Sequence, residues 1–138
     1  MLPKIFYPSK IYCIGVWDLC HEGHRNLLKK ASKLGEVFVG VIKDKAIKKE
    51  KGENRPIISE SQRLSAIKDL KYVTNAWLEN DFIIPNMILE DQNYLIILGE
   101  DQNHIKNLNN IPNSQKIYFP RTEGISTSDI IKRIKNGT

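Results

Sequence analysis

The stretch KIYCIGVWDLCHEGH, Lys10 to His24, decides the fold class. Its first part, Lys10–Val16, is short, apolar and rich in β-branched residues, which is typical of a strand buried on both faces of a parallel sheet. From Gly23 to Leu34 apolar residues recur at helical spacing, and Gly35 supplies a stop. The stretch therefore predicts a buried strand that passes through a tight turn into a helix.

The rest of the chain repeats this alternation. We expect further strands at Glu36–Ile42, Tyr72–Leu78, Tyr94–Leu98 and Lys116–Phe119. We expect helices after the cap Ser59, over Pro85–Asp91 and from Thr127 to about Asn136, and a polar, lysine-rich loop from residue 43 to about residue 58. Alternating strands and helices imply right-handed crossovers. The sequence thus predicts an α/β fold: one Rossmann-like, doubly wound domain over residues 1–138, with a mainly parallel five-stranded sheet and helices on both faces.

The loops at the carboxyl ends of the strands are where a sheet of this kind binds its ligands. Two histidines, His21 and His24, follow the first strand at a spacing of three, so they share one face at the start of a helix. The free N–H groups of a helix start favour anions, and Gly23 lets a bulky anion approach the backbone. A phosphate site is the functional interpretation, and ordinary capping histidines are the structural one.

A zinc site is a further alternative for this turn. Cys13, Cys20, His21 and His24 all carry atoms that can ligate zinc. Cys13, however, lies inside the predicted strand, whereas zinc ligands usually come in pairs from one tight turn. We therefore expect no metal site built from protein ligands.

A second anion site is predicted after the last strand, in the stretch PRTEGISTS, Pro120 to Ser128. Arg121 offers a planar, permanently charged fork for phosphate oxygens, and Ser126 and Thr127 offer hydroxyls and backbone donors at the next helix start. A capped surface helix without a ligand is the structural alternative.

Composition restricts the class of protein. The 138 residues are 41% hydrophobic and 27% charged, which fits one globular domain. The net charge is +5, and a lysine-rich run spans residues 43–55. This run either binds an anionic partner or is a solvated basic loop. No stretch approaches the roughly 18 uninterrupted apolar residues of a membrane span. We expect a cytoplasmic protein with no stable membrane association, and two cysteines suit a reducing compartment.

Two motifs give the chain a family resemblance. HEGH, His21 to His24, fits an H-x-G-H signature, and RTEGISTS, Arg121 to Ser128, is similar to the C-terminal signature of the cytidylyltransferases. H-x-G-H is shared with adenylyltransferases, whereas RTEGIST resembles the glycerol-3-phosphate, choline-phosphate and ethanolamine-phosphate enzymes. The resemblance covers roughly residues 10–136.

The resemblance also implies roles for individual residues. It implies catalytic roles for His21, His24, Lys51 and Arg121, with Lys49 as the alternative to Lys51. It implies contacts with the acceptor for Asp18, Lys51 and Lys71, the last standing where the glycerol-3-phosphate enzymes carry arginine. It implies nucleotide contacts for Gly15, Val16, Trp17, Gly23, Arg63, Gly99, Glu100, Asp101, Arg121, Thr122, Gly124, Ile125, Ser126 and Thr127. The resemblance implies that the backbone of Gly15, Val16 and Trp17 passes beneath the nucleotide. Trp17 replaces the more usual Phe or Tyr, and we expect an apolar slot to tolerate this substitution.

The function that the resemblance implies is transfer of CMP from CTP to a phosphorylated alcohol, which yields a CDP-alcohol and pyrophosphate. Glycerol 3-phosphate is the first acceptor to consider, and choline phosphate and ethanolamine phosphate are alternatives. Magnesium as cofactor and a homodimer are further implications. An ATP-using adenylyltransferase and a noncatalytic nucleotide- or RNA-binding domain stay open, although no RNA-recognition signature is present and we expect no nucleic-acid partner.

Overall fold

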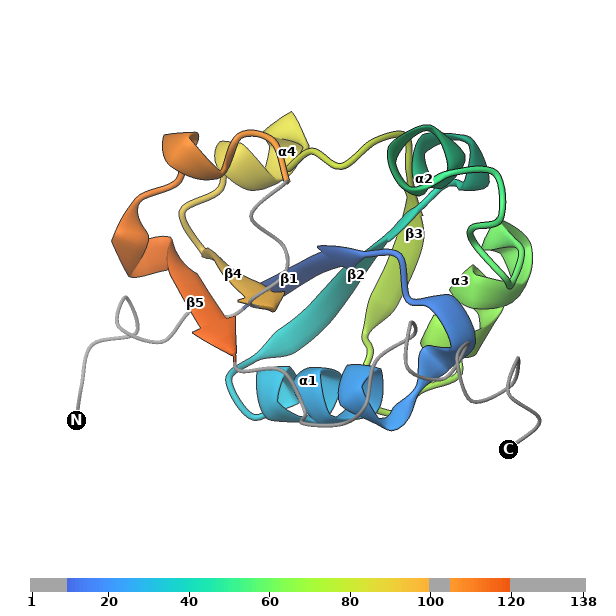
Figure 1. The fold of residues 1–138 in the computed structure, drawn as a ribbon. Helices are drawn as coiled ribbons and strands as arrows, with labels where there is room; N and C mark the ends of the chain where they lie inside the picture. Colours follow the sequence, from blue (N-terminus) through green and yellow to red (C-terminus); the bar gives the residue numbers. More distant parts are fainter. Residues whose placement is uncertain (1–9, 100–104, 120–138) are drawn as a thin grey trace.

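Five parallel strands form the centre of the molecule. The computed structural model describes residues 10–99 and 105–119. The strands are β1 (Lys10–Gly15), β2 (Glu36–Ile42), β3 (Asn75–Glu79), β4 (Tyr94–Gly99) and β5 (Lys116–Phe119), and they form one sheet in the order β3-β2-β1-β4-β5 (Figure 1). Each neighbouring pair is parallel, which confirms the predicted fold class.

Helices cover both faces of this sheet. They are α1 (Glu22–Ser32), α2 (Asp44–Lys51), α3 (Glu60–Lys68) and α4 (Asn86–Leu89), with short 3-10 turns at Asp18–Cys20, Leu108–Asn110 and Asn113–Gln115. Helices α1 and α3 lie on one face, and α2 and α4 lie on the other (Figure 1). None of the helices in the described ranges is long and apolar enough to cross a membrane.

Strict alternation along the strands divides the core into two layers. In β1, Ile11 and Cys13 pack with the α1 and α3 side, whereas Tyr12 and Ile14 pack with the α2 and α4 side. All four side chains are at most 1% exposed, as expected of a strand buried on both faces.

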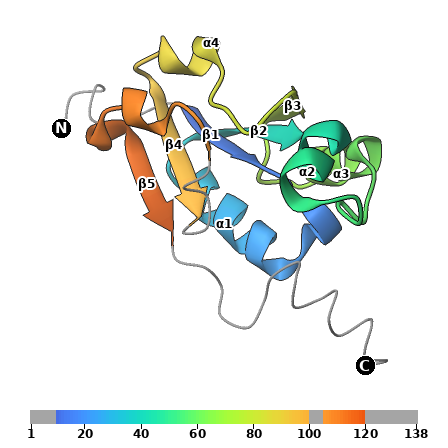
Figure 2. The ribbon, with the colours of Figure 1, turned by 45° about the horizontal axis from the view of Figure 1, so that its top comes forward.

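The order of the strands places a topological switch at β1. The chain runs from β1 outward through β2 to β3 and then returns to the other side of β1 to form β4 and β5 (Figure 2). The connection from β1 to β2 runs through α1 on one face of the sheet, and the connection from β3 to β4 runs through α4 on the other. In such sheets, ligands bind beyond the carboxyl ends of the strands at this switch, so the turn after β1 is the part of the fold to examine first.

The largest difference from the sequence-based expectation is α2. Residues 44–51 were predicted to lie in a loop, but they form a helix. The segment has no glycine or proline, it consists mostly of good helix formers, and its apolar Ile47 is buried against the sheet. The helix begins with Asp44 in its first turn and ends at Gly52, whose φ of 101° suits glycine.

Other boundaries moved by a few residues. Strand β3 begins at Asn75 rather than Tyr72, because Tyr72 and Val73 lie in the turn that leads from α3 into the strand. The cap at Ser59 is confirmed, since its side chain accepts a hydrogen bond from the N–H of Gln62 at 3.4 Å.

Candidate active site

The turn between β1 and α1 has an unusual backbone. Three of its residues that are not glycine have left-handed φ angles: Trp17 at 60°, Leu19 at 64° and Cys20 at 36°. Such conformations cost about 1–3 kcal/mol each and persist only where the surroundings hold them. The contacts of Trp17 and Asp18 explain how this turn is held.

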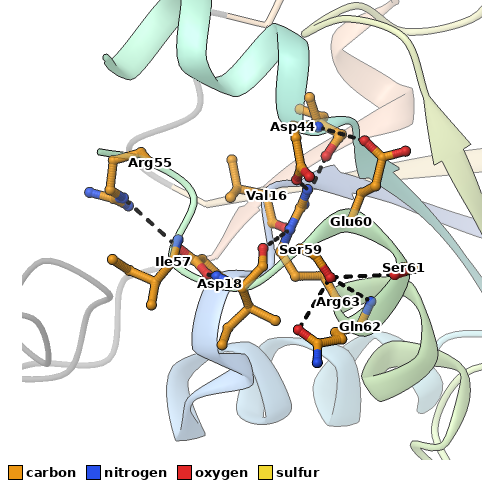
Figure 3. A network of polar contacts seen from close by, with 12 residues as sticks. Val16, Asp18, Asp44, Arg55, Ile57, Ser59, Glu60, Ser61, Gln62 and Arg63 are labelled. Carbon is orange, nitrogen blue, oxygen red and sulfur yellow. Dashed lines mark hydrogen bonds and ion pairs between the residues drawn. The ribbon is translucent and has the colours of Figure 1, made fainter. Parts of the chain in front are cut away.

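Asp18 is one of two charged or polar side chains that are buried among the described residues. It is 1% exposed, and its two carboxylate oxygens accept hydrogen bonds from the backbone N–H groups of Ile57 (2.8 Å) and Ile58 (3.0 Å). Its Oδ2 also lies 3.7 Å from Nε of Arg55, an ion-pair distance (Figure 3). Asp18 thus holds the loop between α2 and α3 against the turn after β1.

The second buried charge is Arg63 of α3, also 1% exposed. Its guanidinium donates to three backbone carbonyls, those of Val16 (2.7 Å), Ile42 (2.7 Å) and Ile58 (2.9 Å). It also forms a 2.6 Å ion pair with Asp44 at the start of α2 (Figure 3). Arg63 therefore ties together the carboxyl ends of β1 and β2 and the starts of α2 and α3.

The two histidines lie together at the start of α1, as the motif spacing predicts. His21 is the N-cap of α1, and its Nδ1 accepts a hydrogen bond from the N–H of His24 at 3.4 Å. Their rings are stacked with centroids 3.7 Å apart and an interplanar angle of 18°. Gly23 lies between them in the first turn. The arrangement presents two imidazoles and a helix start at the carboxyl end of the central strand.

His24 is held in a desolvated position. The ring of Trp17 packs edge-on against the ring of His24, with the two centroids 5.2 Å apart. Burial, followed by the nearby His21 and Arg25, lowers the pKa of His24 to about 3, so its imidazole is neutral at pH 7. A neutral imidazole offers one N–H donor, which suits hydrogen bonding to phosphate oxygens but not general-acid catalysis.

The two candidate lysines lie on α2 and differ in their surroundings. Lys49 and Lys51 are both exposed in the last turn of the helix. Side chains two residues apart on a helix point in nearly opposite directions, about 160° apart. Lys49 is close enough to Asp81 to help lower the pKa of that carboxyl, behind the contributions of Lys106 and of the backbone N–H of Phe82. Lys51 instead ends the helix, ahead of the loop that Asp18 holds, and its assignment over Lys49 stays a prediction from the motif.

Other predicted residues lie at different distances from this turn. Gly15 ends β1, Val16 lends its carbonyl to Arg63, and Gly99 ends β4 at the same edge of the sheet. Lys71 lies in the turn before β3, at the amino-terminal edge, where its ammonium sits 5.4 Å from the centroid of Tyr72. Within one chain, the fold does not bring Lys71 to the histidines.

Eight predicted residues fall outside the described ranges. They are Glu100, Asp101, Arg121, Thr122, Gly124, Ile125, Ser126 and Thr127. Their roles stay predictions from the motif. The predicted helix from Thr127 also lies outside these ranges.

The zinc alternative finds no support in the described part of the chain. Cys13 is buried inside β1 and 1% exposed, and burial raises the pKa of its thiol, which opposes the thiolate form that zinc needs. No group of three or more potential metal ligands occurs among the described residues.

Sequence reasoning missed Asp44, Arg55 and Gly40. Asp44 could have been found as the acidic first residue of a helix, had the segment been recognised as helical. Arg55 gave no signal, because it pairs with Asp18, far away in the sequence. Gly40 gave none either, because its backbone carbonyl accepts a hydrogen bond from the indole N–H of the equally distant Trp17.

Comparison with known proteins identifies the family of this chain. The family model described as cytidylyltransferase-like matches residues 12–133. The chain belongs to the cytidylyltransferase-like family. It is therefore a member of a nucleotidyltransferase family, and the resemblance inferred from HEGH and RTEGISTS is confirmed.

The relatives of this chain have names that point to different enzymatic products. An ethanolamine-phosphate cytidylyltransferase of Dictyostelium discoideum is 29% identical over 90% of this chain and 37% of its own length. An FAD synthase of Methanobrevibacter smithii is 38% identical over 70% of this chain and 65% of its own length. A solved structure, the lipopolysaccharide core biosynthesis protein of Thermoplasma volcanium, has a TM-score of 0.65 and 28% identity, covering 83% of this chain and 98% of its own. This chain thus spans about a third to two thirds of the length of these two curated relatives.

Proposed function

We propose that the chain is a cytidylyltransferase that transfers CMP from CTP to a phosphorylated alcohol and releases pyrophosphate. The observation that carries this proposal is the stacked pair His21 and His24 at the start of α1, beside the topological switch of the sheet. Two imidazoles and the unpaired N–H groups of a helix start are suited to hold a triphosphate.

The chemistry requires positioning more than proton transfer. A phosphate monoester has a second pKa of about 6, so the acceptor is already mostly a dianion near pH 7. One of its oxygens attacks the α-phosphorus of CTP in line, a P–O bond forms, and the bond to the β-phosphate oxygen breaks with pyrophosphate as the leaving group. The protein must hold two anions together and stabilise the charge that passes to pyrophosphate.

Different described residues can hold the two anions and stabilise the charge on pyrophosphate. His24 is neutral and donates one hydrogen bond without needing to change its protonation state. His21 and the start of α1 lie beside it, and Lys51 supplies positive charge from the end of α2. Asp18 and Arg63 are buried and keep α2, the loop and the histidine turn in one arrangement. Arg121, Ser126 and Thr127 complete the proposal as a second phosphate contact.

Magnesium fits this site as an ion carried by the nucleotide. The described residues include no cluster that could hold a metal ion by its own ligands. Magnesium usually keeps several waters and binds substrate phosphates with few protein ligands. When bound, it would neutralise charge on the triphosphate, and no step assigned here to a residue depends on it.

The proposal also names an acceptor substrate and an oligomeric state. Glycerol 3-phosphate remains the first acceptor to test. The name of the Dictyostelium relative supports ethanolamine phosphate as the next, with choline phosphate behind it. A homodimer is proposed from the family resemblance. A cytoplasmic location and one nucleotidyltransferase domain over residues 1–138 are proposed from the composition and length of the sequence.

A second candidate is adenylyl transfer from ATP. The specific observation in its favour is the FAD synthase of Methanobrevibacter smithii, because the product in its name contains adenine and its identity of 38% exceeds that of the Dictyostelium enzyme. The same histidine turn would serve either nucleotide, since it addresses phosphates rather than the base. The nucleotide must therefore be decided by assay.

Pyrophosphate release measures both candidates in one experiment. The purified chain is given CTP or ATP with magnesium and each acceptor in turn, and His21→Ala and His24→Ala are run beside it. We expect turnover with CTP, and a loss of at least about a hundredfold in each variant, the usual cost of removing one preorganised donor. Turnover with ATP alone would replace the first candidate by the second. Near-normal turnover in both variants would refute the assigned site.

A further inference from the structure

We propose that Trp17 is the positioning residue for His24, and that its indole N–H fixes the imidazole in place through the carbonyl of Gly40. The inference rests on the proposed function insofar as it gives His24 a role in phosphate binding. It goes beyond the family resemblance, which assigns Trp17 only a backbone contact and treats its side chain as a tolerated substitution.

Two aromatic rings contact His24, one edge-on and one stacked. Trp17 meets the ring of His24 at an interplanar angle of 67°, and His21 stacks on it at 18°. The centroid distances are 5.2 Å to Trp17 and 3.7 Å to His21. His24 is therefore flanked by one ring from the turn itself and by one from the helix cap.

The Nδ1 atom of the His24 ring is buried and makes no hydrogen bond to the residues that the structure describes, 10–99 and 105–119. A functional histidine is commonly oriented by a hydrogen bond on its second ring nitrogen. Among the described residues Nδ1 has no such partner, so we assign the orientation of the imidazole to the rings that pack against it.

Trp17 is itself held firmly. Its indole N–H donates to the backbone carbonyl of Gly40 at 3.0 Å, in a buried position, and Trp17 is only 5% exposed. Gly40 lies in the middle of β2 and pairs with Ile14 of β1 and Trp77 of β3, so the acceptor is part of the rigid centre of the sheet. The chain of contacts runs from this rigid carbonyl through Trp17 to His24.

This chain of contacts gives a reason for tryptophan at position 17. Phenylalanine would fill the same apolar slot but has no donor for the carbonyl of Gly40. Losing that hydrogen bond frees the ring to shift, and small misplacements of a catalytic group cost much of its effect.

The test compares Trp17→Phe with Trp77→Phe. Trp77 is a matched control, because its indole N–H also makes a hydrogen bond, at 2.5 Å to Oε1 of Glu79, and its side chain packs in the layer on the other face of the sheet. We expect Trp17→Phe to lower kcat by about tenfold while KM for the nucleotide changes less than about twofold, and Trp77→Phe to leave both nearly unchanged.

A double-mutant cycle separates positioning from general damage. In the His24→Ala background, Trp17→Phe should lower kcat by less than about twofold, because the group that it positions is gone. An equal loss of kcat in both backgrounds, or an equal loss for Trp17→Phe and Trp77→Phe, would overturn the inference.

An NMR readout keeps this inference separate from the proposed function and from the folding of any variant. In the wild-type chain, nuclear Overhauser contacts should join the rings of Trp17 and His24, and the indole N–H of Trp17 should be protected from hydrogen exchange. Ring contacts that are absent, or an N–H that exchanges like free indole, would overturn the inference even if the enzyme is active. A wild-type chain that shows both signals but no pyrophosphate release would refute the proposed function alone.

Discussion

Replacing Asp18 by asparagine tests whether the histidine turn and the loop after α2 are locked together. The substitution keeps the size of the side chain but removes its charge and turns one acceptor oxygen into an amide donor. One of the two backbone N–H groups, of Ile57 or Ile58, then faces another donor in a buried position. The ion-pair partner Arg55 also loses its counter-charge.

The magnitude follows from the contacts. A hydrogen bond to a charged group contributes about 1.5–3 kcal/mol, and an unsatisfied buried donor costs about 1–3 kcal/mol. Losing one such bond and weakening the other predicts a destabilisation of about 2–4 kcal/mol. A domain of this size is stable by roughly 5–15 kcal/mol, so the variant should fold but unfold at lower denaturant.

Urea denaturation followed by circular dichroism measures this loss, and kcat measured on the folded variant reports whether the loop is displaced. Asp81→Asn is the matched control, because Asp81 also accepts a backbone N–H, from Phe82 at 2.7 Å, and pairs with Lys106 at 2.9 Å, but its side chain is 46% exposed. We expect the control to cost no more than about 1 kcal/mol. If Asp18→Asn cost no more than Asp81→Asn, the buried network would not hold the site as described.

Three further predictions concern single residues. His24, whose pKa is lowered to about 3 from an ordinary 6.5, contributes stability that is fully present above pH 6.5 and is lost as pH falls toward 3. Between pH 6.5 and 5 it should account for about 2 kcal/mol of the fall in unfolding free energy, and His24→Asn should lack this part in urea titrations at both pH values. Lys51→Ala should lower kcat by about tenfold or more with little change in melting temperature, whereas Lys49→Ala should change neither; equal effects in the kinetic assay would contradict the assignment of Lys51. Gly40→Ala should destabilise the fold by about 1–3 kcal/mol in urea, because its new Cβ would overlap the buried hydroxyl of Tyr12, and unchanged stability would contradict this close contact.

Local signals in the sequence were sufficient for most of the fold. The run KIYCIGV is apolar without interruption because β1 is the central strand, and the motif spacing of His21 and His24 placed them on one face of α1. The cap at Ser59 followed from Gln62 three residues on. These features depend on neighbours in the sequence, which is why the sequence revealed them.

Features that depend on distant partners were not predictable. Arg63 was expected beside the nucleotide, but its burial reflects carbonyl groups at the ends of two strands and Asp44 of another helix. Asp18 finds its partners about 40 residues further along the chain. The lysine-rich segment was mistaken for a loop because its charge hid a single buried side chain, Ile47, that holds α2 to the sheet.

The most direct test of the central claim is pyrophosphate release by the wild-type chain and by His24→Ala, with CTP and ATP compared against a panel of phosphorylated alcohols. The proposal predicts turnover with CTP and at least one acceptor, and a loss of about a hundredfold or more in the variant. No turnover with either nucleotide across the panel, or turnover that survives the loss of His24, would contradict it.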